Sequence, residues 1–240
     1  METKLNYKRT FLIGLAFLSI CSFWQMYDNI IPLILQNTYH LGETMTGAVM
    51  ALDNVLAIFL LPVFGALSDK VHTKLGRRMP FIVAGTILAV IFMMLLPMID
   101  NAEKARWGTG ESFSNQVIFL AVLFFTLVSM GLYRSPAVAL MPDVTPNHLR
   151  SRANAVINLM GAVGGVYALI MIKVLVGKGE TPDYLPLFAS IAAVMAIAVG
   201  ILVITIRENK LREEVEKAEA ANAGTIEEKA MAEGVEAAGE

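Results

Sequence analysis

The sequence predicts an all-α membrane protein with six transmembrane helices. The 240 residues are 56% hydrophobic and 17% charged, with a mean hydropathy of +0.60, whereas soluble domains carry about 25% charged residues. Six apolar stretches each have the length of about 20 residues that a helix needs to cross a bilayer. Lysine and arginine gather in alternate connections between these stretches, which is typical of a multi-span protein.

The apolar stretches fill most of residues 1–206 and define the first of two predicted regions. We expect transmembrane spans at residues 11–36, 46–67, 80–99, 116–140, 153–176 and 184–206. The first stretch follows Lys4, Lys8 and Arg9 but precedes no small-residue cleavage site. It is therefore interpreted as a retained span and not as a removed signal peptide.

The basic residues also orient the spans. Segments 1–10, 68–79, 141–152 and 207–240 hold most of the lysine and arginine, whereas the other loops hold only Lys104, Arg106 and Lys178. Because cytoplasmic loops of membrane proteins are enriched in these residues, both termini are predicted to be cytoplasmic. We expect a multi-pass protein of the plasma membrane.

The second region, residues 207–240, is a charged tail with ten glutamates against five lysines and arginines. Its alanine and glutamate content favours helix, and Thr225 begins a capping box with Glu228. The tail has too little hydrophobic surface for a core of its own. We expect a solvated, partly disordered arm on the cytoplasmic side.

Three charged residues lie well inside predicted spans: Asp28, Asp53 and Arg134. A charge near the centre of a bilayer costs on the order of 2.5–3.5 kcal/mol, so it requires a functional or structural reason. Lys173 lies near the outer end of its span, where its long side chain can reach the membrane surface. The three deeper charges are therefore the candidate functional groups.

Asp28 and Asp53 are predicted to lie at similar depths on consecutive antiparallel helices. At about 1.5 Å per residue, Asp28 is about 12 Å and Asp53 about 10 Å from the outer face. Two facing carboxylates repel each other and favour a shared proton, and a bound Na⁺ would relieve the same repulsion. The sequence does not choose between these ions, and each carboxylate alternatively pairs with a polar neighbour.

Further polar and aromatic residues accompany these charges. Arg134 keeps its proton and needs an acceptor, so it either hydrogen-bonds substrate hydroxyls or pairs with a carboxylate until substrate binds. Trp24 shares a helix face with Asp28, and an aromatic ring beside hydrogen-bonding groups suits a sugar. Packing or a place in the interfacial belt is the alternative for Trp24. Additional candidates for the cavity are Tyr27, Asn54 and Asn158.

A weak internal repeat is consistent with these positions. Tyr27 and Asp28 in the first span correspond to Tyr133 and Arg134 in the fourth. These spans run in opposite directions, so equivalent residues lie at opposite depths, as in a three-plus-three inverted repeat. Chance is the alternative explanation for two matching dipeptides.

The loop after the second span reads GALSDK at 65–70 and GRR at 76–78. This pattern resembles the signature loop of the major facilitator superfamily, in the same loop and on the same predicted side. The resemblance implies that the chain forms one half of a major-facilitator fold. It assigns a cytoplasmic gate motif to Gly65, Asp69, Gly76, Arg77 and Arg78.

A second set of motifs points to a smaller group within this superfamily. The sequence reads YRSPAVALMPD at 133–143, LRSRAN at 149–154 and NLMG at 158–161, and W-x-x-Y-D begins at Trp24. These motifs resemble the glycoside–pentoside–hexuronide cation symporters, and within them the sucrose-transporter-like group. The resemblance implies cation-coupled uptake of a di- or oligosaccharide, with Asp143 and Arg150 added to the gate. An arginine of the plant sucrose carriers aligns with Val138 here, four residues from Arg134.

That family has twelve spans, and the resemblance covers its N-terminal six-span half. The implied partners are a sugar, membrane lipid and a second six-span half, as a separate chain or in a parallel homodimer. The alternatives are a non-transporting membrane interaction module or inactive fragment, and a carrier of another small solute. Cys21 and the three histidines form no ligand set, and no catalytic or cofactor motif is present. We therefore expect no enzyme, no bound metal, no cofactor beyond a coupling cation and no nucleic-acid partner.

Overall fold

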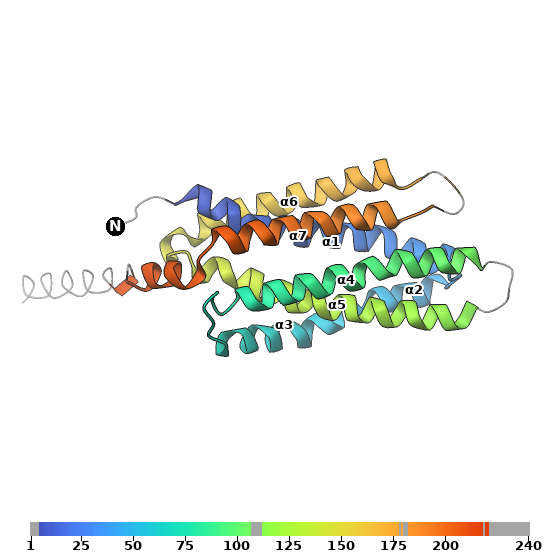
Figure 1. The fold of residues 1–240 in the computed structure, drawn as a ribbon, viewed down its shortest axis with the longest axis horizontal. Helices are drawn as coiled ribbons and strands as arrows, with labels where there is room; N and C mark the ends of the chain where they lie inside the picture. The colour runs from blue at the N-terminus through green and yellow to red at the C-terminus, as the bar shows by residue number, and fades with distance from the viewer. Residues whose placement is uncertain (1–4, 107–111, 178, 180–181, 218, 221–240) are drawn as a thin grey trace, which may run out of the picture.

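The computed structural model describes residues 5–106, 112–177, 179, 182–217 and 219–220, apart from the side chains of 112–114. The described chain is a bundle of long helices that run roughly parallel to its longest axis (Figure 1). The elements are α1 (Tyr7–Asn37), α2 (Glu43–Met50), α3 (Leu52–Lys70), α4 (Met79–Ala105), α5 (Ser112–Asp143), the 3-10 turn η1 (Asn147–Leu149), α6 (Arg150–Leu175) and α7 (Leu185–Thr205).

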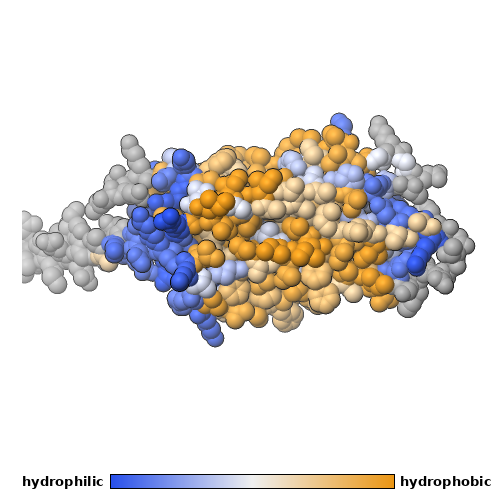
Figure 2. Space-filling model, viewed as in Figure 1, coloured by the Kyte–Doolittle hydropathy of each residue, from blue (hydrophilic) through white to orange (hydrophobic). Residues whose placement is uncertain are grey.

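The predicted fold class is confirmed. Within the described residues, six helical segments are long and apolar enough to cross a membrane, and each contains one of the stretches expected from the sequence to within two residues. Figure 2 shows a broad apolar band across the face in view, with hydrophilic surface at both ends. We call the end that carries residues 5–10, 70–78 and 206–220 the N-terminal end of the bundle.

The second span differs from an uninterrupted helix. Its two parts, α2 and α3, meet at Ala51, two residues before Asp53. The interruption is local, because the amide of Ala51 still donates to the Gly47 carbonyl and that of Val55 to the Ala51 carbonyl, at 2.9 and 3.2 Å. A charged residue thus lies beside a break in an otherwise regular membrane helix.

The bundle centre is built from α1, which packs against α6 and α7, and from α4, which packs against α5 and α7. Glycines permit the closest approaches. A β-carbon at Gly164 would overlap the backbone carbonyl of Leu18, and one at Gly85 would overlap the backbone of Tyr133. Small residues bring helix backbones together in membranes, so the glycines of α6 serve its contact with α1 of the same bundle.

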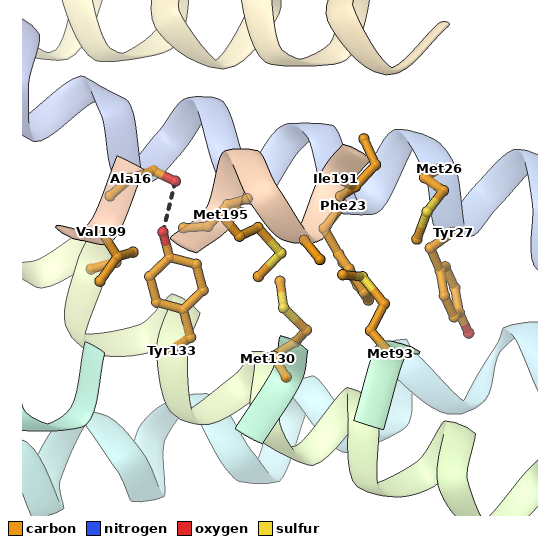
Figure 3. Packing of buried hydrophobic residues seen from close by; sticks show 14 of the residues in the cluster. Ala16, Phe23, Met26, Tyr27, Met93, Met130, Tyr133, Ile191, Met195 and Val199 are labelled. Atoms are coloured by element: carbon orange, nitrogen blue, oxygen red, sulfur yellow. Dashed lines mark hydrogen bonds between the residues drawn. The ribbon is translucent and has the colours of Figure 1, made fainter. Parts of the chain in front are cut away.

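The buried core is apolar and rich in methionine and aromatic residues (Figure 3). Met93, Met130 and Met195 meet Phe23 between the helices. The hydroxyls of Tyr27 and Tyr133 are polar groups in this view, and that of Tyr133 is hydrogen-bonded. It donates to the Ala16 carbonyl at 3.0 Å and lies 2.6 Å from the Ser19 hydroxyl, so the buried group is satisfied.

Several helices expose apolar side chains, among them α3 and α6. None of the most apolar 18-residue window of the α2–α3 segment is buried inside the bundle. Ile58 and Phe59 on α3 are 70% and 65% exposed, and Leu159 and Val174 on α6 are exposed to similar extents. In a membrane such faces contact lipid or another helix.

At the end of the bundle opposite the N-terminus, buried polar contacts link the helices to one another. The Asp100 carboxylate is fully buried, accepts from the Thr38 hydroxyl at 2.7 Å and pairs with Lys104 at 2.6 Å. The Lys104 ammonium also donates to the Pro182 carbonyl at 2.6 Å and lies 4.6 Å from the centre of the Tyr184 ring. These contacts connect the end of α1 and the start of α7 through α4.

The segment after α7 departs from the expected solvated arm. Residues 208–217 are helical, and Leu211 and Val215 are buried against the bundle. Polar contacts also hold the segment. In one of them, the side-chain amide of Asn209 donates to the Thr73 carbonyl at 2.9 Å. The hydrophobic surface missing for a separate core is supplied by the bundle itself. Residues 221–240, including the capping box at Thr225, lie outside the described residues.

Candidate functional site

The residues of the loop motif form an ion-pair network at the N-terminal end of the bundle. Asp143, at the end of α5, accepts from Arg77 at 3.0 Å and from Arg78 at 2.9 Å. Asp69, near the end of α3, pairs with Arg78 at 2.6 Å and with Arg77 at 3.7 Å. Two arginines and two carboxylates thus join α3, α4 and α5.

Gly65 and Gly76 of the loop motif have different structural roles. The Gly65 carbonyl accepts from Arg78 at 3.2 Å, which is the same guanidinium that holds the carboxylates. Gly76 has φ of 126°, in the region that L side chains rarely adopt. Its amide and carbonyl both bond to Thr73, which closes the turn before Arg77 and Arg78.

Arg150 does not join this network. Its guanidinium donates to the backbone carbonyls of Pro142 and Thr145, at 2.9 and 3.2 Å. The last carbonyls of a helix lack partners within the helix, and α5 ends at Asp143. Arg150 therefore satisfies the end of α5.

Glu208 is a member of this region that the sequence analysis missed. Its carboxylate accepts from the backbone amides of Arg77, Arg78 and Met79 at 2.9–3.0 Å, and the residue is 1% exposed. These amides begin α4, and a carboxylate is favourable at a helix N-terminus. The sequence held one indication of this role: Glu208 is the first acidic residue after the last predicted span.

The electrostatics of Arg77 follow from these contacts. Partial burial alone would lower the pKa of its guanidinium. The hydrogen bond and charge of Asp143, together with the charges of Asp69 and Glu208, outweigh burial and raise the pKa above its ordinary value. Arg77 is therefore positively charged at every physiological pH.

Two of the three charged residues of the spans, Asp53 on α3 and Arg134 on α5, lie at one small cavity. Trp24, Asp53 and Arg134 line it, together with apolar residues of α3 and α5. The Arg134 guanidinium lies over the Trp24 ring, 5.5 Å from its centre, and such a cation–π contact is strongest where water is scarce. The volume of about 20 Å³ holds a water molecule but no sugar.

Asp28 lies one helical turn beyond Trp24 and is exposed at the surface of the bundle. It is close enough to Asp53 for the two carboxylate charges to act on each other, and both charges act on the Tyr27 hydroxyl. Within the described chain, neither carboxylate pairs with a cation. Their similar depth in the membrane stays a prediction from the sequence.

The two amide candidates take different positions. Asn54 donates to the Asp53 carboxylate from its backbone and from its side chain, at 2.6 and 2.9 Å. Asn158 is exposed on α6 and does not line the cavity beside Trp24. The structure joins Asn54 to this group of residues and leaves Asn158 outside it.

Two buried donors in this region have no partner. The Trp24 Nε1 and the Tyr27 hydroxyl are shielded from solvent and make no hydrogen bond within the described chain. Figure 3 shows the Tyr27 hydroxyl directed away from α1, toward the light-blue helix of the second span. A buried donor without an acceptor costs about 1–3 kcal/mol. Both donors are therefore available to a ligand that brings oxygen acceptors.

The fold and these charges define a polytopic helical membrane protein. Within its apolar band lies a group of polar residues, which we call the polar face: Trp24, Asp28, Asp53 and Arg134. Comparison with known proteins identifies its family: residues 6–235 match the model of the Major Facilitator Superfamily. The chain belongs to this superfamily, and its six helices form one half of the superfamily's fold.

Several curated relatives are plant sucrose transport proteins. The chain is 35% identical to sucrose transport protein SUC4 of Arabidopsis thaliana over 116 residues, which is 45% of this chain and 22% of the relative. It is 26% identical to sucrose transport protein SUT3 of Oryza sativa subsp. japonica over 137 residues, 54% of this chain and 27% of the relative. The match thus spans about a quarter of the length of these curated relatives.

Proposed function

We propose that this chain is the N-terminal half of a carrier that couples the uptake of a di- or oligosaccharide to the movement of a cation. The observation that carries the proposal is the polar face formed by Trp24, Asp28, Asp53 and Arg134 within the apolar band. Charges at such depth are costly. Binding of an ion and a polar substrate is the functional reason for placing these charges in the membrane.

In this proposal Trp24, Tyr27 and Arg134 hold the sugar. Nε1 of Trp24 and the hydroxyl of Tyr27 are buried donors without acceptors, and sugar hydroxyls supply acceptors. The Arg134 guanidinium adds donors beside the indole ring. An aromatic face with a few convergent polar groups is the usual composition of a small-molecule site.

The size of the cavity favours a second half. About 20 Å³ is far too small for a disaccharide, whereas Asp28 and the α3 surface are open. The two halves of a major-facilitator transporter are related by an axis along the membrane normal. We infer that the sugar lies between this polar face and a second six-helix unit.

The coupling cation is assigned to Asp28 and Asp53. Their charges repel each other, and either a proton or Na⁺ relieves that repulsion. Within the described residues, no group of three or more His, Cys, Asp or Glu residues is placed to hold a metal ion. A Na⁺ would therefore take further ligands from hydroxyl, carbonyl or water oxygens.

The proposal is tested by transport in proteoliposomes that contain the protein together with any co-purifying second half. A panel of sugars identifies the substrate by counterflow, and proton and sodium gradients are then imposed separately. In Asp53→Asn, we expect counterflow to persist and gradient-driven accumulation to fall at least tenfold. The neutral amide no longer requires a cation, so sugar movement is uncoupled.

Glu213→Gln is the matched control, because Glu213 is an exposed carboxylate outside the polar face. Its accumulation should equal that of the unmodified protein. Undiminished cation coupling in Asp53→Asn would refute the role of Asp53. Counterflow of a non-sugar solute alone would indicate a carrier of another class, and no transport by the assembled protein would indicate an interaction module.

A further inference from the structure

A second cavity lies at the N-terminal end of the bundle, apart from the polar face of Trp24 and Asp53. It is a groove of about 310 Å³ between the start of α1 and the chain that leaves α7. This volume is at the lower end of the range of about 300–1,000 Å³ that is usual for small-molecule sites. The lining residues are Asn6, Lys8, Arg9, Leu12, Thr205, Ile206, Arg207, Lys210, Leu211 and Glu214.

The groove has an excess of positive charge. Lys8, Arg9, Arg207 and Lys210 line it, against the single carboxylate of Glu214. Arg9 pairs with Glu214 at 3.4 Å. In the described part of the chain, the other three cations make no ion pair. Three neighbouring charges without a counterion favour a bound anion.

The floor of the groove is apolar and lies at the edge of the membrane band. Ile206 and Leu211 are buried and Leu12 is partly buried. The last residue of α7 is Thr205, so the groove begins where a membrane helix ends. Figure 2 shows that the apolar band meets hydrophilic surface at this end. Phe11 and Ile204, the chain neighbours of the lining residues Leu12 and Thr205, are also exposed.

The combination of unpaired cations and an apolar floor favours one class of ligand. A free anion uses the cations but leaves the apolar floor uncovered. An anionic glycerophospholipid uses both, because its phosphate carries the charge and its acyl chains lie along apolar side chains. Basic pockets between membrane helices on the lysine- and arginine-rich side bind such head groups.

We propose that this groove binds an anionic glycerophospholipid. Lys8, Arg207 and Lys210 contact its phosphate, while Leu12 and Ile204 contact its acyl chains. Glu214 holds Arg9 in place and so limits the number of charges that the lipid must satisfy. This site is separate from the proposed sugar and cation sites, and its test does not depend on transport.

The test measures lipid retention by native mass spectrometry of the purified full chain. The protein is exchanged into neutral detergent and titrated with phosphatidylglycerol or with phosphatidylcholine of the same acyl length. We expect one phosphatidylglycerol per chain with at least a tenfold preference over phosphatidylcholine. The triple variant Lys8→Gln/Arg207→Gln/Lys210→Gln should lose affinity on the order of 100-fold.

The matched control is Lys74→Gln/Arg152→Gln/Lys217→Gln, which removes the same charge from exposed positions outside the groove. It should bind within twofold of the unmodified protein. A charge-retaining variant, Lys8→Arg/Arg207→Lys/Lys210→Arg, should also bind, which separates loss of charge from loss of folding. Binding should weaken with added NaCl.

Two outcomes would overturn the proposal. Equal loss of phosphatidylglycerol in the groove variant and in the control variant would show only a general effect of net charge. Displacement of the lipid by glycerol 3-phosphate at equal concentration would show that the site takes a soluble phosphate and that the apolar floor has no part.

Discussion

At the scale of single residues, the polar face combines a contact between helices with a contact inside one helix. Arg134 lies over the ring of Trp24, and Asp53 receives two hydrogen bonds from Asn54. Tyr27 is buried with an unpaired hydroxyl, whereas the corresponding Tyr133 is fully bonded. The two tyrosines of the predicted repeat therefore differ in their hydrogen bonding: the Tyr133 hydroxyl is satisfied within the bundle, and the Tyr27 hydroxyl is not.

Trp24→Phe removes the indole N–H and keeps an aromatic ring. Because one hydrogen bond contributes about 0.5–1.5 kcal/mol, we expect the KM for the transported sugar to rise about two- to tenfold. The dependence on the cation gradient should not change. Initial rates in proteoliposomes measure both quantities. Tyr7→Phe is the control, since Tyr7 is exposed at the N-terminal end, and an unchanged KM in Trp24→Phe would exclude the N–H as a sugar donor.

At the scale of elements, backbone approach and end-capping hold the helices in place. Gly164 lets α6 reach the carbonyl of Leu18 on α1, and the Ser22 hydroxyl donates to the Gly164 carbonyl at 2.9 Å. Glu208 caps the first turn of α4 from a segment far along the chain. These contacts define the α1–α6 pair and the N-terminal end of the bundle.

Gly164→Ala should destabilise the bundle, because its β-carbon would meet a backbone that has no room to move. Overpacking of this kind costs typically 1–3 kcal/mol. Gly165→Ala is the matched control, since its β-carbon would lie 3.7 Å from the end of the Gln25 side chain. Thermal unfolding in detergent should show a lower midpoint for Gly164→Ala alone. Equal midpoints for both variants would contradict the close approach.

Glu208→Ala should also lower the unfolding midpoint. It leaves the amides of Arg77, Arg78 and Met79 without their acceptor, and each buried unpaired group costs about 1–3 kcal/mol. Glu208→Gln keeps an oxygen acceptor but loses the charge at the helix N-terminus, so we expect an intermediate midpoint. Glu213→Gln serves again as the exposed control. A midpoint of Glu208→Ala equal to that of the control would refute the capping role.

At the scale of the whole molecule, an apolar band separates two hydrophilic ends (Figure 2). The N-terminal end carries the ion-pair network, the helix at 208–217 and the basic groove. The opposite end is joined by the buried pair of Asp100 and Lys104. The exposed faces of α3 and α6 lie between these ends and are the surfaces that a second half or lipid would cover.

The orientation of the whole molecule is tested by single cysteines in a Cys21→Ser background. We expect Gly177→Cys to react with a membrane-impermeant maleimide in intact cells. Glu213→Cys should react only after permeabilisation, because the lysine- and arginine-rich end is predicted to face the cytoplasm. The opposite labelling pattern would reverse the predicted topology.

The sequence predicted much of this arrangement, for identifiable physical reasons. Span positions follow from local hydropathy, which is a property of neighbouring residues in the chain. The roles of Arg150 and Glu208 were not predictable in the same way. Arg150 bonds backbone carbonyls that only the fold presents to it, and Glu208 reaches a helix that is remote in the chain.

The sequence by itself determined the six-span topology and the family, because hydropathy and motif spacing are local properties of the chain. Only the tertiary structure decided which groups meet: Arg134 over Trp24, Glu208 at the start of α4, and the basic groove beside Arg207. Such contacts depend on how helices rotate and approach one another. That rotation is decided by packing between segments that are distant in the sequence.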